Sequence, residues 1–146
     1  MQQFEFIDTL EAYAISKGWN FVLKFDDFYA NIEAQKDYAP GELVLTVDYN
    51  SLPVINNGRV TSITYTSLMA LGRCFDIDTT KASLDETFRQ KYDRRLKELE
   101  SELANSIAEF ACTNELEVSL TPMNSDINVY DTNIDFVITT ATFIQN

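Results

Sequence analysis

The chain has 146 residues, of which 45% are hydrophobic and 23% charged, and these values are ordinary for one globular domain. The sequence has neither an apolar run of the ~20 residues that a membrane-spanning helix requires nor the basic and apolar start of a secretory signal. The net charge of −12 disfavours sequence-independent binding to nucleic acids, whose phosphates the surface repels. We therefore expect one domain over residues 1–146 that is made and kept in a cytoplasm, without membrane association.

The N-terminal segment predicts a helix over residues 4–17. Apolar side chains at Ile7, Leu10 and Ala14 recur at helical spacing. Gly18 follows directly, and glycine readily adopts the left-handed conformation that ends helices. The helix is therefore expected to stop at Lys17.

Two strands are predicted after this helix. Residues 19–30 and residues 42–49 alternate apolar and polar side chains, the pattern of half-buried strands. The polar stretch 31–41 separates them as a loop. Pro53 predicts the end of the second strand, because proline lacks the N–H that a strand ladder uses.

Asn57-Gly58 is the strongest hairpin signal in the chain, because both residues accept positive φ angles. It leads into a long strand over residues 60–71, although residues 67–71 are also compatible with a helix. Residues 73–82 are expected to form a polar loop.

A long helix is predicted from Ser83 onward. Residues 83–86 fit a capping box, in which a serine and a glutamate satisfy each other's backbone N–H groups. No Gly or Pro interrupts the apolar stripe that follows, which extends for roughly 40 Å at 1.5 Å per residue. The stripe consists of Phe88, Tyr92, Leu96, Leu99, Leu103, Ile107 and Phe110.

Strands around residues 116–121 and 134–143 are predicted to close the chain, with a polar turn at Asn124-Ser125-Asp126 between them. The last strand has apolar residues on both faces, so we expect one face against the long helix and the other partly buried. The predicted fold class is α+β: a mainly antiparallel sheet of about five to six strands, with the N-terminal helix and one long helix packed on one face.

The sequence shows none of the common catalytic or metal-binding motifs, which leaves open only a site built from carboxylates, Lys or Tyr contributed by neighbouring subunits. There is no histidine, which excludes the Ser-His-Asp and Cys-His arrangements, and the four glycines are too scattered for a phosphate-binding loop. Residues 76–80 begin like a calcium loop, but Lys81 stands where that loop needs glycine. The cysteines at 74 and 112 are interpreted as small buried hydrophobes. We expect no enzymatic activity and no catalytic, cofactor-binding or metal-binding residues.

The predicted long helix is basic in its first half and acidic in its second, opposite to the preference of the helix dipole. One interpretation is a solvated face with ion pairs between successive turns. Another is that one end of the helix meets the acidic surface of a neighbouring copy, and a contact of basic residues with DNA is a third. The candidate subunit-interface residues are Arg89, Lys91, Arg94, Arg95, Lys97, Glu98 and Glu102.

The order of elements resembles one protein family. A helix ending at residues 17–19 is followed by an extended segment, 25–31, and Tyr38-Ala-Pro40 leads into the strand 43–47. A long strand then precedes a long charged helix, and residues 129–143 close the chain with an aspartate-containing turn and a final strand. In this order the chain resembles the bacteriophage tail-terminator and neck proteins, which act in head–tail connection and tail completion.

The resemblance implies a structural virion protein that forms a homo-oligomeric ring, hexameric or larger, at the neck or tail end of a tailed bacteriophage. Its partners would be portal, neck and tail proteins, and DNA would pass through the ring without sequence-specific binding. The protein would reside in the virion, and in the host cytoplasm during assembly. The alternative is a small acidic cytosolic adaptor or immunity-type protein that binds a basic protein partner.

Overall fold

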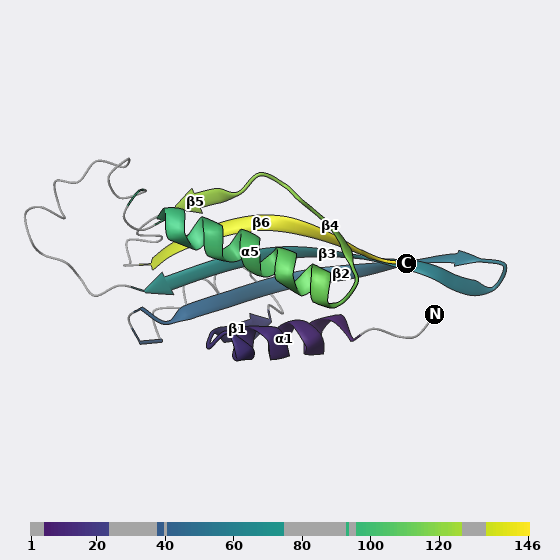
Figure 1. Ribbon diagram of the computed structural model, residues 1–146, viewed down its shortest axis with the longest axis horizontal. Helices are drawn as coiled ribbons and strands as arrows, with labels where there is room; N and C mark the ends of the chain where they lie inside the picture. Colours follow the sequence, from purple (N-terminus) through teal and green to yellow (C-terminus); the bar gives the residue numbers. More distant parts are fainter. Residues whose placement is uncertain (1–4, 24–37, 40, 75–92, 94–95, 127–133) are drawn as a thin grey trace, which may run out of the picture.

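A computed structural model describes residues 5–23, 38–39, 41–74, 93, 96–126 and 134–146. Within them the chain forms the predicted α+β fold, with two helices and one six-stranded sheet (Figure 1). The strands lie in the order β1-β2-β3-β6-β4, and β5 pairs with β6 beside β4. All neighbouring strands are antiparallel except β1 and β2, which are parallel. No helix in this part of the chain has the length and apolarity needed to cross a membrane.

The first helix, α1 (Phe6–Ser16), confirms the predicted helix and its stop. Gly18 has a φ of +78°, and the N–H of Trp19 donates to the carbonyl of Ala14 at 3.0 Å. This left-handed turn reverses the chain directly into β1 (Asn20–Leu23). The remainder of the predicted first strand, residues 24–30, and most of the following loop lie outside the described residues.

The longest element is the hairpin of β2 (Leu43–Asn56) and β3 (Arg59–Cys74). Asn57 and Gly58 have φ angles of 52° and 75°, which confirms the predicted tight turn. The prediction that Pro53 ends the strand is wrong: β2 continues through it, paired with Ile63 of β3. At Pro53, β3 is the one described strand that pairs with β2, because β1 pairs only with residues 44–47. The edge of β2 that faces away from β3 forms no strand–strand hydrogen bonds there among the described residues, so a proline is tolerated at this position.

The end of β3 also differs from the prediction. Residues 67–71, which were also compatible with a helix, are a strand. Arg73 and Cys74 were assigned to a loop but continue β3, because Asp135 and Ile134 of β6 pair with them. Residues 75–82 of the predicted loop lie outside the described residues.

The second helix, α5 (Lys97–Thr113), contains the C-terminal part of the predicted long helix. Its apolar stripe is buried as predicted, namely Leu99, Leu103, Ile107 and Phe110, with Leu96 just before it. The predicted start at Ser83 and the first turns fall outside the described residues. Cys112, expected to be buried, is exposed because it lies off this stripe.

The closing strands are β4 (Glu117–Leu120), β5 (Asn124–Asp126) and β6 (Ile134–Gln145). The predicted turn at residues 124–126 is wrong: these residues form β5, paired with residues 136–138 of β6. β4 pairs with the other end of β6, at residues 141–144. A short strand of polar residues is stabilised here by main-chain hydrogen bonds to β6, which its composition does not reveal.

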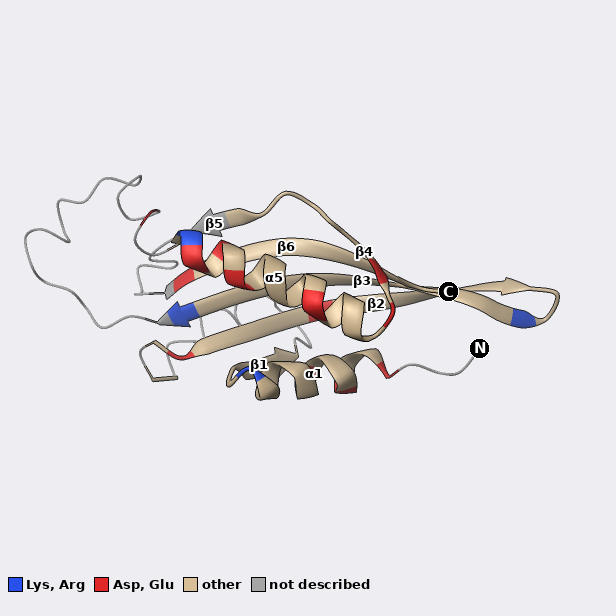
Figure 2. Cartoon of the chain, viewed as in Figure 1, with Lys and Arg blue, Asp and Glu red and all other residues tan. Residues whose placement is uncertain are grey.

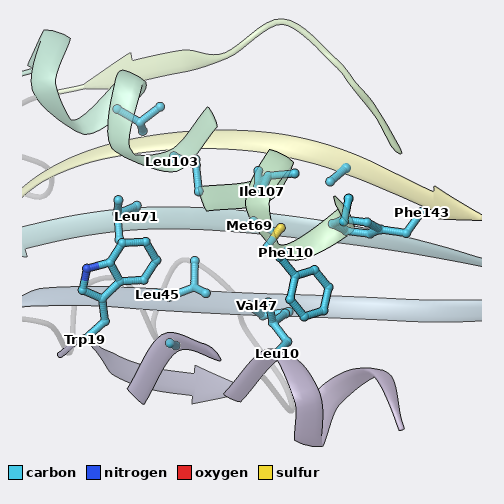
Figure 3. Packing of buried hydrophobic residues seen from close by; sticks show 14 of the residues in the cluster. Leu10, Trp19, Leu45, Val47, Met69, Leu71, Leu103, Ile107, Phe110 and Phe143 are labelled. Carbon is cyan, nitrogen blue, oxygen red and sulfur yellow. The ribbon is translucent and has the colours of Figure 1, made fainter. Parts of the chain in front are cut away.

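Both helices pack on the same face of the sheet (Figures 1 and 3). Phe110 and Leu103 of α5 and Leu10 of α1 meet side chains of the three central strands, such as Leu45, Met69 and Phe143. At the end of the sheet where β2 begins, the opposite face is buried too, at Val44, Ala70 and Phe136. This confirms that both faces of the last strand are partly buried, and here the burial arises within the single chain.

Candidate assembly surface

The two central strands β2 and β3 extend past the rest of the sheet. β6 pairs with β3 only as far as Ile63, so beyond that residue β2 and β3 form a two-stranded ribbon within the described structure. We call residues 52–63 the hairpin arm. It projects away from the helices and the sheet (Figure 1). At about 3.4 Å per residue, its turn lies roughly 14 Å beyond the last residue of β6.

The hairpin arm carries apolar side chains in solvent. Leu52 is 64% exposed and Ile55 is 67% exposed, and Val54 and Val60 are also exposed. An isolated two-stranded ribbon has no layer to cover such side chains and is marginally stable on its own. Single exposed apolar residues are common, but here four of them lie on the two faces of one projecting hairpin, which makes the hairpin a candidate surface for binding another protein.

A cleft of about 340 Å³ lies at the base of the hairpin arm, on the helix side of the sheet. Its walls are the N-terminal end of α1 and the facing residues of β2 and β3. We call it the acidic cleft, and its lining residues are Glu5, Phe6, Ile7, Asp8, Tyr49, Ser51, Pro53, Ile63 and Tyr65.

The acidic cleft combines carboxylates with aromatic rings. Glu5 and Asp8 are exposed at its edge, and neither forms a salt bridge with a residue that the structure describes. The pKa of Tyr65 is raised above 10.0, mainly by burial and also by nearby Tyr49 and the negative charge of Glu5. The Tyr65 hydroxyl donates a hydrogen bond to Oε1 of Gln145 at 3.2 Å.

The charge of the hairpin arm is opposite to that of the cleft. Residues 52–63 contain no acid and one cation, Arg59, which pairs with Asn56 directly beside the turn. Arg59 is exposed and forms no ion pair within the described part of the chain. In Figure 2 it is the blue segment on the arm, whereas α1 and α5 carry mostly red segments.

Four of the seven predicted interface residues, Arg89, Lys91, Arg94 and Arg95, lie outside the described residues. Lys97 and Glu98 are exposed in the first turn of α5. Glu102 is instead engaged within the chain, because its Oε1 lies 3.3 Å from Nζ of Lys17. This ion pair joins α5 to the C-terminal end of α1. A role of Lys97, Glu98 and Glu102 in a subunit interface stays a prediction.

A buried carboxylate in β6 was not predicted from the sequence. Asp135 is fully buried in β6, and Arg73 of β3 lies directly opposite it in the strand register. Both residues make further interactions within the chain. A buried charge needs such compensation, so a structural role accounts for this Asp135–Arg73 juxtaposition. Across the described ranges, no three potential metal-ligating side chains come together.

The hairpin arm was missed because Pro53 was taken as a strand end. A signal was nevertheless present: the apolar run Leu52-Pro-Val-Ile55 directly precedes the Asn57-Gly58 turn, and Val60 follows it. Apolar residues on both sides of an Asn-Gly turn indicate that both strands of a hairpin continue up to the turn.

No protein-family model matches this chain, and no curated protein is significantly similar to it in sequence.

Proposed function

We propose that this chain is a structural assembly protein that forms a homo-oligomeric ring of the tail-terminator or neck type in a tailed bacteriophage. The observation that carries the proposal is the hairpin arm, which exposes Leu52 at its base and Val54, Ile55 and Val60 beyond the last residue of β6. The resemblance to tail-terminator and neck proteins implies that its partners are portal, neck and tail proteins.

Apolar burial of the arm supplies part of the free energy that such an assembly requires. Covering one Val, Leu or Ile side chain completely stabilises a contact by about 1.5–3 kcal/mol. The side chains of the arm are exposed only in part, so each contributes less than this on association. Together they amount to several kcal/mol, which is a substantial part of the ~8 kcal/mol that a micromolar contact requires.

The charge of the chain suits a passage for DNA. A lumen lined by a protein of net charge −12 does not hold phosphates, so DNA would pass without being trapped. The same charge makes copies repel one another, and burial of the apolar arm offsets part of that repulsion.

The test is the size of the purified protein, measured by light scattering coupled to size exclusion and by electron microscopy. The wild type is expected to form closed rings. The double variant Ile55→Thr/Val60→Thr keeps β-branched residues in the strands and removes apolar surface, so it is expected to dissociate into monomers.

The matched control is Ile15→Gln. Ile15 is 61% exposed, close to the exposure of Ile55, but lies on α1 rather than on the arm. It should leave the assembly intact. A wild type that stays monomeric at high concentration would overturn the proposal, and binding of that monomer to a basic protein would favour the alternative adaptor function.

A further inference from the structure

We infer that the acidic cleft receives the hairpin arm of a second copy of this chain, with Arg59 placed against Glu5 and Asp8. This inference rests on the proposed self-assembly and names the two surfaces that meet. The partner is a second copy because one chain presents both halves of a complementary contact.

The hairpin arm cannot enter the acidic cleft of its own chain. Pro53 and Ile63 at the base of the arm form part of the cleft wall, and the turn lies roughly 14 Å farther out along the same ribbon. Both strands of the ribbon are paired up to Asn56 and Arg59, which keeps the tip away from its own cleft. An arm that fills the cleft therefore comes from another molecule.

The acidic cleft and the hairpin arm both present apolar side chains. The cleft offers aromatic and aliphatic walls, with Tyr49, Tyr65 and Ile63 facing its interior. The arm offers Ile55 and Val60, which pair with each other across the ribbon near its tip. Inserting these two side chains removes apolar surface from water on both partners.

The hairpin arm and the edge of the acidic cleft carry opposite charges. Arg59 is the cation of the arm, and Glu5 and Asp8 stand at the edge of the cleft, all three without an ion pair among the described residues. Opposite charges placed at the edge of an apolar contact fix its orientation and speed association. In a chain of net charge −12, an exposed cation at the tip of the arm, next to the apolar pair Ile55–Val60, is attracted to an acidic surface of a second copy.

The experiment exchanges the charges and measures self-association by sedimentation velocity over a range of concentrations. Arg59→Glu alone and Glu5→Lys/Asp8→Lys alone are each expected to weaken association at least tenfold. Combining all three substitutions restores the opposite charges and is expected to bring association back to within about threefold of the wild type.

A matched control is Glu11→Lys, an exposed acid on α1 that does not line the cleft. It changes the net charge in the same direction as Glu5→Lys/Asp8→Lys, by half as much, and should leave association within about threefold of the wild type. Circular dichroism of every variant checks that α1 still folds. If the combined variant folds but does not recover association, the cleft is not the receptor.

The outcomes separate this inference from the proposed function. If Ile55→Thr/Val60→Thr dissociates the assembly but the charge exchange does not restore it, the arm binds elsewhere and only this inference fails. If the charge exchange restores association but the wild type is a dimer, the cleft is confirmed as the receptor for the arm, and the proposal that the protein forms a ring is contradicted. Two copies can exchange arms reciprocally, because cleft and arm are adjacent, whereas a ring requires each arm to pass to the next copy.

Discussion

Phe6 is the residue on which the aromatic packing of the core converges. Its ring stacks on Tyr65 with centroids 4.7 Å apart, meets Phe110 edge-on at 5.9 Å and lies 5.4 Å from Phe143. These contacts join the start of α1 to the sheet and to α5. The same residue also lines the acidic cleft, so core packing holds one wall of the candidate receptor site in place.

Replacing Phe6 with alanine is expected to destabilise the fold by about 3–5 kcal/mol, because the change leaves a cavity among rings that relax only in part. The measurement is the free energy of unfolding in urea. Ile15→Ala, at an exposed position of the same helix, is expected to change it by less than about 1 kcal/mol. Equal effects at the two positions would contradict the packing described for Phe6.

Three side chains make stability sensitive to alkaline pH. Burial, and to a smaller extent Glu109, raises the pKa of Tyr13 above 10.0, and the pKa of Tyr65 is raised in the same direction. The pKa of Lys17 is raised above 10.5, chiefly because Glu102 accepts its hydrogen bond.

A group whose pKa is higher in the folded state stabilises the fold fully below its unfolded pKa and loses that contribution as pH rises through the folded pKa. Stability is therefore expected to be level from pH 8 to 9 and to fall above pH 10. Urea midpoints at pH 9 and 11 measure the fall. The double variant Tyr13→Phe/Tyr65→Phe should show a smaller fall, and an unchanged one would refute the assignment to these tyrosines.

At the scale of elements, both helices end in the same way. The N–H of Trp19 donates to Ala14 and that of Gly18 to Ile15, and at the end of α5 the N–H of Leu116 donates to Ala111 and that of Glu115 to Cys112. Trp19 and Leu116 are both buried after their turns. These are Schellman motifs, whose left-handed residue is a glycine in the first case and a glutamate with φ of 55° in the second.

Substitutions at the left-handed residues of these two helix ends are expected to change the stability of the fold in opposite directions. Glu115→Gly is expected to stabilise the fold by roughly 0.5–1 kcal/mol, because glycine adopts the left-handed conformation without strain. Gly18→Ala introduces that strain and is expected to destabilise it by roughly 1 kcal/mol. Thermal unfolding of the two variants beside the wild type measures both. A stabilised Gly18→Ala would contradict the positive φ at that position.

At the scale of the whole molecule, burial decreases along the two longest strands. β2 is buried from Val44 to Val47 and exposed from Tyr49 outward, so one end of the sheet is enclosed on both faces and the other ends in the hairpin arm. The molecule is thus a stable body with a projecting ribbon. The body supplies the free energy of folding, and the ribbon is available for association.

The overall charge gives a prediction about DNA. At physiological salt the protein, assembled or not, is expected to leave the mobility of double-stranded DNA unchanged in a gel, because its charge of −12 repels phosphates. A retarded band that disappears as salt is raised would show a basic surface that outweighs this charge, and would count against a passive DNA passage.

The sequence by itself determined the features that depend on neighbouring residues. The stop of α1 at Gly18, the turn at Asn57-Gly58 and the buried stripe of α5 follow from φ preferences and from a period of 3.6 residues, which are local properties. The α+β class followed from the order of these elements.

Only the tertiary structure decided the features that depend on pairing between distant strands. β2 continues through Pro53 because β3 supplies a partner, and residues 124–126 are a strand because β6 does. Glu102, predicted at an interface, meets Lys17 because α1 and α5 lie side by side. The acidic cleft joins residues 5–8 to residues 49–65, and a one-residue change in register would turn its lining to the other face of the sheet.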